Sequence, residues 1–138
     1  MPRWVCPSCD RQFGRVKQGH ECAPAMSLEE YFSTGPSFER PVFDAVMAGL
    51  RPLDGVHVEP VSVGIFLKRS RTFAELRPMT KWVAVSFSLA RTIPSERIAR
   101  KVIEVGTRRY HVVNVRSADE VDEGLLDWLT EAYLFCPE

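Results

Sequence analysis

The sequence predicts an α+β protein, with an antiparallel sheet of about five or six strands and helices packed mainly on one face. Three observations lead to this class. Apolar residues recur every three to four positions before residue 52 and again after residue 117, as in amphipathic helices. Between Gly55 and Val115 the period changes to two, as in strands with one buried face. Short turns separate most of these strands, and short connections join antiparallel strands.

The 138 residues divide into a cysteine-bearing segment, residues 1–26, and a main domain, residues 27–138. The first segment has no long apolar period and cannot bury enough surface to fold alone. The whole chain contains 45% hydrophobic and 26% charged residues, as an ordinary soluble protein does. No apolar run is long enough to span a membrane. No signal-peptide core precedes Cys6, so we expect a cytoplasmic protein.

Two helices are expected at the start of the main domain. Ser27-Leu28-Glu29-Glu30 is a capping box, so a short helix should run from Leu28 to about Phe32 and end at Gly35-Pro36. We expect Ser37 to cap a second helix. The apolar positions of that helix are Phe38, Val42, Phe43, Val46 and Leu50.

The strands follow the second helix. Val56 and Val58 alternate in a short strand that Pro60 should limit, and two hairpins should contain strands 63–68 with 72–77 and 102–105 with 109–115. The clearest strand is 81–89. One of its faces carries Val83, Val85, Phe87 and Leu89, and the other carries Ala84, Ser86 and Ser88.

Two more helices are expected late in the chain. Ser95 should cap a short helix that continues to Arg100. Ser117-Ala118-Asp119-Glu120 is a second capping box, which should begin a long final helix. The apolar stripe of that helix is Val121, Leu125, Trp128, Leu129 and Ala132.

The candidate metal-binding residues of this chain lie near its N-terminus. Two residues separate Cys6 from Cys9 in a C-x2-C turn, and ten residues separate Cys9 from His20-Glu21-Cys22. With no secretion signal, such clustered thiols favour a metal over disulfides. We predict one structural Zn²⁺ per chain, held in a zinc knuckle by Cys6, Cys9, His20 and Cys22. The alternative is a tail with incidental cysteines, and the close His-x-Cys spacing weakens the match to a DNA-reading finger.

The net charge is zero, but the charges are unevenly distributed. Residues 61–116 contain twelve lysines and arginines against three acids, whereas residues 117–138 contain seven acids and no base. Two readings are open: the bases contact an anionic partner such as a nucleic acid, or they occupy solvated turns and pair with the acidic last helix. The candidate anion-binding or nucleic-acid-binding residues are Lys68, Arg69, Arg71, Arg97, Arg100, Lys101, Arg108 and Arg109.

Signals of catalysis are absent from the sequence. His57 and His111 each fall in a predicted strand, where a single histidine is more often a surface or hydrogen-bonded residue than a catalyst. Cys136 is interpreted as a small apolar or exposed residue near the chain end. The sequence contains no glycine-rich phosphate loop and no Gly-x-Ser-x-Gly elbow. We therefore expect a protein that is not an enzyme.

Several stretches resemble known proteins. The residues Trp4 to Cys9, the following Arg11-x-Phe13 and His20-Glu21-Cys22 are similar to the N-terminal knuckle of a group of small bacterial proteins. A second set of segments, covering Leu28 to Tyr133, resembles the domain-of-unknown-function family 5655. These are Tyr31-Phe32 to Pro36, Val58-Glu59-Pro60, Phe73 to Pro78 and Leu126 to Tyr133. The resemblance implies a compact α+β domain and carries no catalytic residue over to this chain.

Three functions remain open at this point. The leading hypothesis is a zinc-binding, non-enzymatic interaction module whose knuckle and basic sheet surface dock an anionic partner, for example a nucleic acid. The second is a protein–protein adaptor that uses the acidic last helix or the linker. The third is a small-molecule site over Ala84, Ser86 and Ser88, lined by His111 or His57, which a sheet face covered by helices would exclude.

Overall fold

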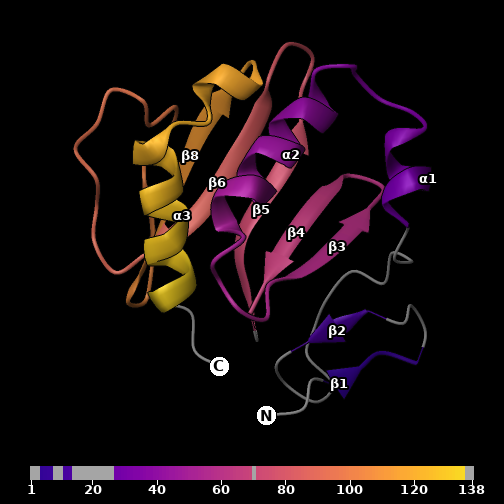
Figure 1. The fold of residues 1–138 in the computed structure, drawn as a ribbon. Coiled ribbons are helices and arrows are strands. Elements are labelled where there is room, and N and C mark those ends of the chain that lie inside the picture. Colours follow the sequence, from indigo (N-terminus) through magenta and orange to yellow (C-terminus); the bar gives the residue numbers. More distant parts are fainter. Residues whose placement is uncertain (1–3, 8–10, 14–26, 70, 136–138) are drawn as a thin grey trace.

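The computed structural model describes residues 4–7, 11–13, 27–69 and 71–135. Six of its strands form one antiparallel sheet in the order β3-β4-β5-β6-β8-β7 (Figure 1). They are β3 (His57–Val61), β4 (Gly64–Lys68), β5 (Thr72–Pro78), β6 (Val83–Leu89), β7 (Ile103–Val105) and β8 (Arg108–Val115). Two further strands, β1 (Trp4–Val5) and β2 (Gln12–Phe13), pair with each other in a separate hairpin. The predicted α+β class and its six-stranded antiparallel sheet are confirmed.

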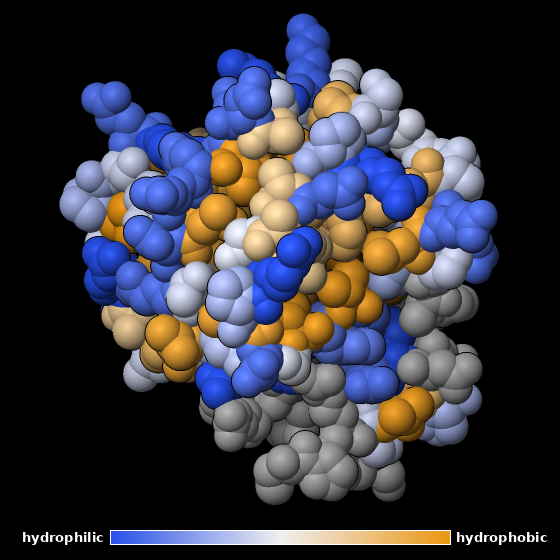
Figure 2. All heavy atoms as spheres, in the orientation of Figure 1, coloured by the Kyte–Doolittle hydropathy of each residue, from blue (hydrophilic) through white to orange (hydrophobic). Residues whose placement is uncertain are grey.

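Three α-helices accompany the sheet: α1 (Leu28–Phe32), α2 (Glu39–Leu50) and α3 (Glu123–Phe135). Figure 1 shows α2 and α3 lying side by side across one face of the sheet, while α1 lies at the side of β3. On this helix-bearing side, hydrophilic residues gather around the rim and hydrophobic residues appear between them (Figure 2). None of the helices in the part of the chain described is long and apolar enough to cross a membrane.

The strand register explains why the helices cover only one face. Ile65, Leu76, Val85 and Val113 are register partners across four neighbouring strands, and all four are buried in the main core. The helices contribute to that core through Val42, Val46 and Leu50 from α2 and Leu125, Leu129 and Ala132 from α3. These are apolar positions that helical periodicity picks out in the sequence, so the core follows the predicted stripes.

Three of the predicted helix starts differ from the structure. The box at Ser27 is confirmed, because the Ser27 hydroxyl accepts the Glu30 N–H at 3.1 Å. In contrast, α2 has Phe38 as its N-cap residue, with no side-chain capping bond, so Ser37 does not cap it. The predicted helix after Ser95 is also wrong. That segment instead forms an isolated bridge between Ile98 and Val113, extending the contacts of β8.

The box at Ser117 starts only a single 3-10 turn, Ala118–Glu120. The Glu120 carboxylate turns back and accepts the Arg116 N–H at 2.6 Å. The long helix begins later, where Asp122 Oδ1 accepts the Leu125 N–H at 3.0 Å. This bond, and to a smaller extent the hydrogen bond from Arg97, holds the pKa of Asp122 below its usual value. Asp122 therefore performs the capping that the sequence pattern assigned to Ser117.

The first strand of the sheet also extends further than predicted. Pro60 lies within β3 and is the register partner of Ile65, so it does not limit the strand at Val58. β3 is at one edge of the sheet, where a proline is tolerated because one side of the strand needs no sheet hydrogen bonds.

Candidate functional site

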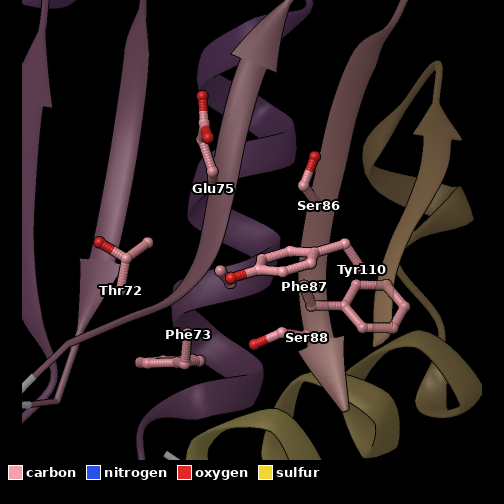
Figure 3. A pocket seen from close by; sticks show the side chains of 8 residues that line it. Thr72, Phe73, Glu75, Ser86, Phe87, Ser88 and Tyr110 are labelled. Atoms are coloured by element: carbon pink, nitrogen blue, oxygen red, sulfur yellow. The ribbon is translucent and has the colours of Figure 1, made fainter. Parts of the chain in front are cut away.

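The second face of the sheet carries a different set of side chains from the helix-bearing face. Its central row of register partners is Glu59, Phe66, Glu75, Ser86 and Val112. No helix of the described residues covers this row, and in Figure 3 the helices lie behind the strands that carry it. We call this surface the helix-free face. A face covered by helices would have excluded the small-molecule hypothesis, and this face is not covered by any helix of the described residues.

A shallow hollow of about 60 Å³ lies on this face. Figure 3 shows Tyr110 reaching over β6 between Ser86 and Ser88, with Thr72 and Glu75 on the other side of the hollow. The lining therefore combines hydroxyl groups, one aromatic ring and one carboxylate. That carboxylate is already paired, because Arg77 Nη2 lies 2.9 Å from Glu75 Oε1.

Apolar side chains extend the same face toward its β7 edge. Ile103 is the register partner of Tyr110, and Val105 is the partner of Arg108. Because side chains alternate along a strand, Ile103, Val105 and Tyr110 share one face. Their exposed fractions are 62%, 55% and 37%. The structure thus leaves a small apolar surface uncovered beside basic residues, a combination that occurs at binding surfaces.

The first three candidate anion contacts lie at or beside the β4–β5 turn. Lys68 is only 2% exposed and its Nζ lies 3.0 Å from Glu59 Oε1. Arg69 lies over the ring of Tyr133 at 4.4 Å and donates to the Tyr133 carbonyl at 3.2 Å. Arg71 is exposed. Thr72, the next residue, lines the hollow.

The other five candidates lie on or near the opposite edge of the sheet. Arg97 binds Asp122 at 2.7 Å, and Arg109 lies 3.3 Å from Glu104. Arg100 and Lys101 are exposed in the segment before β7. Arg108 is half-buried and begins β8, two residues before Tyr110. None of the eight candidates lines the hollow, but Arg71 directly precedes Thr72 and Arg108 lies two residues before Tyr110, and both Thr72 and Tyr110 line it.

Part of the basic charge pairs with the acidic last helix, as the second reading of the charge pattern expects. Arg97 binds Asp122, which caps α3, and Arg91 makes two bonds with Glu131 within α3, at 2.9 and 3.0 Å. The bond from Arg91 holds the pKa of Glu131 below its ordinary value. Arg100, Lys101 and Arg108 have no such ion pair with a described residue, so their charge is available on the surface.

Of the four predicted zinc ligands, the structure describes Cys6, and Cys9, His20 and Cys22 lie outside the described residues. Cys6 is buried, and its N–H donates to the Arg11 carbonyl at 2.9 Å. Next to this bond, the register of the hairpin pairs Val5 with Gln12 and then Trp4 with Phe13. Cys6, the first residue of the C-x2-C pattern, therefore directly follows β1 and is bonded to the residue just before β2.

The most highly charged buried cluster was not predicted as a site. Glu59 is 2% exposed and contacts Arg11 Nε at 2.6 Å, Lys68 Nζ at 3.0 Å and His57 Nε2 at 3.3 Å. The Gln12 N–H adds a bond of 3.2 Å. Lys68 in turn donates to the Gln12 carbonyl at 2.7 Å. This Glu59 cluster attaches the N-terminal hairpin to the helix-free face at β3 and β4 (Figure 1).

The cluster has a defined electrostatic state. Burial alone would raise the pKa of Glu59, but hydrogen bonds from His57, Arg11 and Lys68 outweigh it and hold the pKa far below its ordinary value. Glu59 is therefore ionised and offsets the positive charge of the buried Arg11 and Lys68. Arg11 also lies over the ring of Phe66 at 5.2 Å. The only signal for Glu59 in the sequence is strand alternation, which places it on the opposite face from Val58.

The two histidines do not line the hollow. His111 is fully buried on the helix-bearing side, stacked on Phe87 at 5.4 Å. Its Nε2 accepts the Ile93 N–H at 3.1 Å, so its Nδ1 carries the proton that bonds the Arg109 carbonyl at 2.9 Å. Burial lowers the pKa of His111, which keeps it neutral. His57 belongs to the Glu59 cluster. Both are hydrogen-bonded residues, and no acid–base role follows from either.

Comparison with known proteins identifies the main domain. Residues 28–136 match the model of a family described as Domain of unknown function (DUF5655). No curated protein and no solved structure matches the chain. The match covers the predicted main domain and leaves the N-terminal hairpin outside the family model.

Proposed function

We propose a binding role for this chain, which belongs to the DUF5655 family, a family whose description names no activity. In this proposal the protein is a non-enzymatic module that docks a single-stranded nucleic acid on its helix-free face. The N-terminal zinc knuckle, fixed by the Glu59 cluster, borders that face. The observation that carries the proposal is the hollow between two arginine-bearing turns, with an exposed tyrosine over a floor of small serines.

The chemistry of this surface suits an unpaired strand better than a duplex. A flat, open sheet face lets successive bases stack on aromatic rings, while arginine and lysine contact the phosphates. Tyr110 supplies the ring, and Arg71 and Arg108 lie on the segments that flank it. Ser86 and Ser88 leave room for a base, because their side chains are small. The volume of about 60 Å³ is far below that of a pocket enclosing a drug-sized ligand.

Binding of a fluorescein-labelled 20-mer of thymidines, followed by fluorescence anisotropy, tests this role. We expect the affinity to fall steeply as salt rises from 50 to 200 mM, because phosphate contacts release counterions. The double variant Arg71→Glu/Arg108→Glu should bind at least about tenfold more weakly, since it removes two phosphate contacts and adds two repulsive charges.

The matched control is Arg40→Glu/Arg51→Glu. Both arginines are exposed, and they lie on α2 and at its C-cap, on the helix-bearing side. This double variant changes the net charge equally and should leave most of the affinity intact. If the two double variants lost equal affinity, binding would depend on net charge alone and not on the helix-free face. Binding that is independent of salt, or undetectable, would contradict the docking role.

The zinc component has its own test. Full-length protein purified without chelator should contain one zinc per chain by mass spectrometry, because three thiolates and one imidazole complete a tetrahedral site. Three of the four cysteines should resist modification by a thiol reagent until a chelator is added. A metal-free chain with four equally reactive cysteines would remove the zinc knuckle from the proposal.

A further inference from the structure

A second hollow, of about 170 Å³, lies at the other end of the molecule. It is next to the β3–β4 turn and the last residue of β5, whereas the β4–β5 and β7–β8 turns lie at the opposite end of the sheet. The segment between α1 and α2 forms its other wall. Its lining residues are Tyr31, Thr34, Gly35, Glu39, Ser62 and Pro78. None of the lining residues is lysine, arginine or histidine.

The carboxyl group of Glu39 is the central feature of this hollow. Glu39 is the first residue of α2 and is only 2% exposed. The Tyr31 hydroxyl donates a hydrogen bond to its Oε2. A Cβ atom added to Gly35, which lines the hollow, would lie 3.4 Å from Oε1, so this oxygen faces the hollow. Within the described part of the chain, no cationic side chain pairs with Glu39.

An uncompensated carboxylate in such a place is costly. Burial raises the pKa of Glu39, although the bond from Tyr31 acts in the opposite direction. Burial, together with the bond to Glu39, raises the pKa of the Tyr31 hydroxyl strongly as well. Among the described residues, Glu59 is the other fully buried acid, and it is surrounded by three basic side chains. Glu39 Oε2 accepts one hydrogen bond from a neutral donor, the Tyr31 hydroxyl, and Oε1 is left to accept a hydrogen bond from a ligand in the hollow.

We propose that this hollow binds a primary ammonium group through Glu39 Oε1, with the hydroxyls of Thr34 and Ser62 as further acceptors. A buried carboxylate needs a partner that is both cationic and a hydrogen-bond donor, and an ammonium group is both. The size agrees, because a cavity of ~150 Å³ holds a molecule as large as benzene. Two sources supply this group: a free alkylamine, or a lysine side chain of another protein. This site is independent of the nucleic-acid docking proposed for the helix-free face.

Nuclear magnetic resonance of the ¹⁵N-labelled full-length chain tests the site. Titration with n-propylammonium chloride, at constant ionic strength, should give saturable shifts at the amides of Tyr31, Thr34, Gly35 and Ser62. The neutral analogue n-butanol should bind at least about tenfold more weakly, a difference of about 1.4 kcal/mol. A blocked Gly-Lys-Gly peptide distinguishes the sources: tighter binding than n-propylammonium indicates a protein lysine, and weaker binding indicates a free amine.

Two variants separate the site from a general effect of charge. Glu39→Gln keeps the shape and removes the charge, and should weaken n-propylammonium binding by at least about tenfold. Ser62→Phe fills the mouth of the hollow from an exposed turn, so it should abolish binding even if Glu39→Gln folds poorly. The control is Glu29→Gln, an exposed acid on α1. Unsaturable shifts, equal binding of n-butanol, or equal losses in Glu29→Gln and Glu39→Gln would overturn the proposal.

Discussion

Replacing Glu59 by alanine is expected to lower the free energy of unfolding at pH 7 by roughly 3–5 kcal/mol, the cost of breaking a buried ion pair. Arg11 and Lys68 are 7% and 2% exposed, so the variant leaves two cations buried without their carboxylate. Their bonds to Glu59, of 2.6 and 3.0 Å, have no substitute in alanine. Urea unfolding followed by circular dichroism gives the free energy directly.

The matched control for this variant is Glu104→Ala. Glu104 also forms an ion pair, with Arg109 at 3.3 Å, but its side chain is 68% exposed. Exposed pairs contribute about 0–1 kcal/mol, so this variant should unfold almost as the wild type does. If the two variants lost equal stability, the Glu59 cluster would be no more than a surface interaction and would not fix the N-terminal hairpin.

The same cluster determines how stability depends on pH. The pKa of Glu59 is far lower in the folded chain than the value of roughly 4.3 expected in the unfolded chain. The unfolded chain therefore binds a proton at a higher pH than the folded chain does. The stabilisation by Glu59 is complete well above the unfolded value and is lost as the pH falls below it. The stability difference between wild type and Glu59→Gln should accordingly shrink between pH 7 and pH 3.

Replacing Phe87 by alanine is expected to cost about 3–5 kcal/mol, the usual range for a buried aromatic residue. Phe87 is 2% exposed, and its ring stacks on His111 at 5.4 Å and on Trp128 of α3 at 6.1 Å. The variant leaves a cavity between β6 and α3. Urea unfolding should show a lower midpoint with an unchanged slope, because the surface that becomes exposed on unfolding is nearly the same in the variant and the wild type.

An exposed apolar residue serves as the comparison for Phe87. Ile103 lies in β7 with 62% of its side chain exposed, so Ile103→Ala should change stability by no more than about 0.5 kcal/mol. A loss below about 1 kcal/mol in Phe87→Ala would mean that the core closes around the missing ring. The interface between α3 and β6 would then be less tightly packed than its stacked rings indicate.

The sheet was largely predictable because its signals are local. Alternation along 81–89 places Val83, Val85, Phe87 and Leu89 in the core, and all four are buried there. A glycine turn at Gly106-Thr107 separates the strands of the second predicted hairpin, and the basic turn 69–71 separates those of the first. The failures arise where a distant contact competes with a local one. Ile98 is drawn to Val113 in β8, which prevents a helix after Ser95.

The candidate sites show the same division. Basic residues in turns can be found by reading the chain, but their pairing cannot. Lys68 belongs to a buried cluster, whereas Arg71, three residues later at the same turn, is exposed. Arg11 and Glu59 are 48 residues apart, so no local pattern joins them. Glu39 reads as an ordinary acid in the first turn of a helix. Its burial is visible only once the β3–β4 turn is placed beside it.

The edges of the sheet have a consequence for how copies of this chain meet in solution. An unpaired strand edge is a template on which a strand of another molecule can add, which is how many sheet proteins aggregate. One outer strand, β3, contains Pro60, which has no amide hydrogen to offer, and the other, β7, has only three residues. Neither margin supports a long intermolecular ladder. The protein can thus keep one sheet face open to a ligand while remaining a poor seed for fibrils.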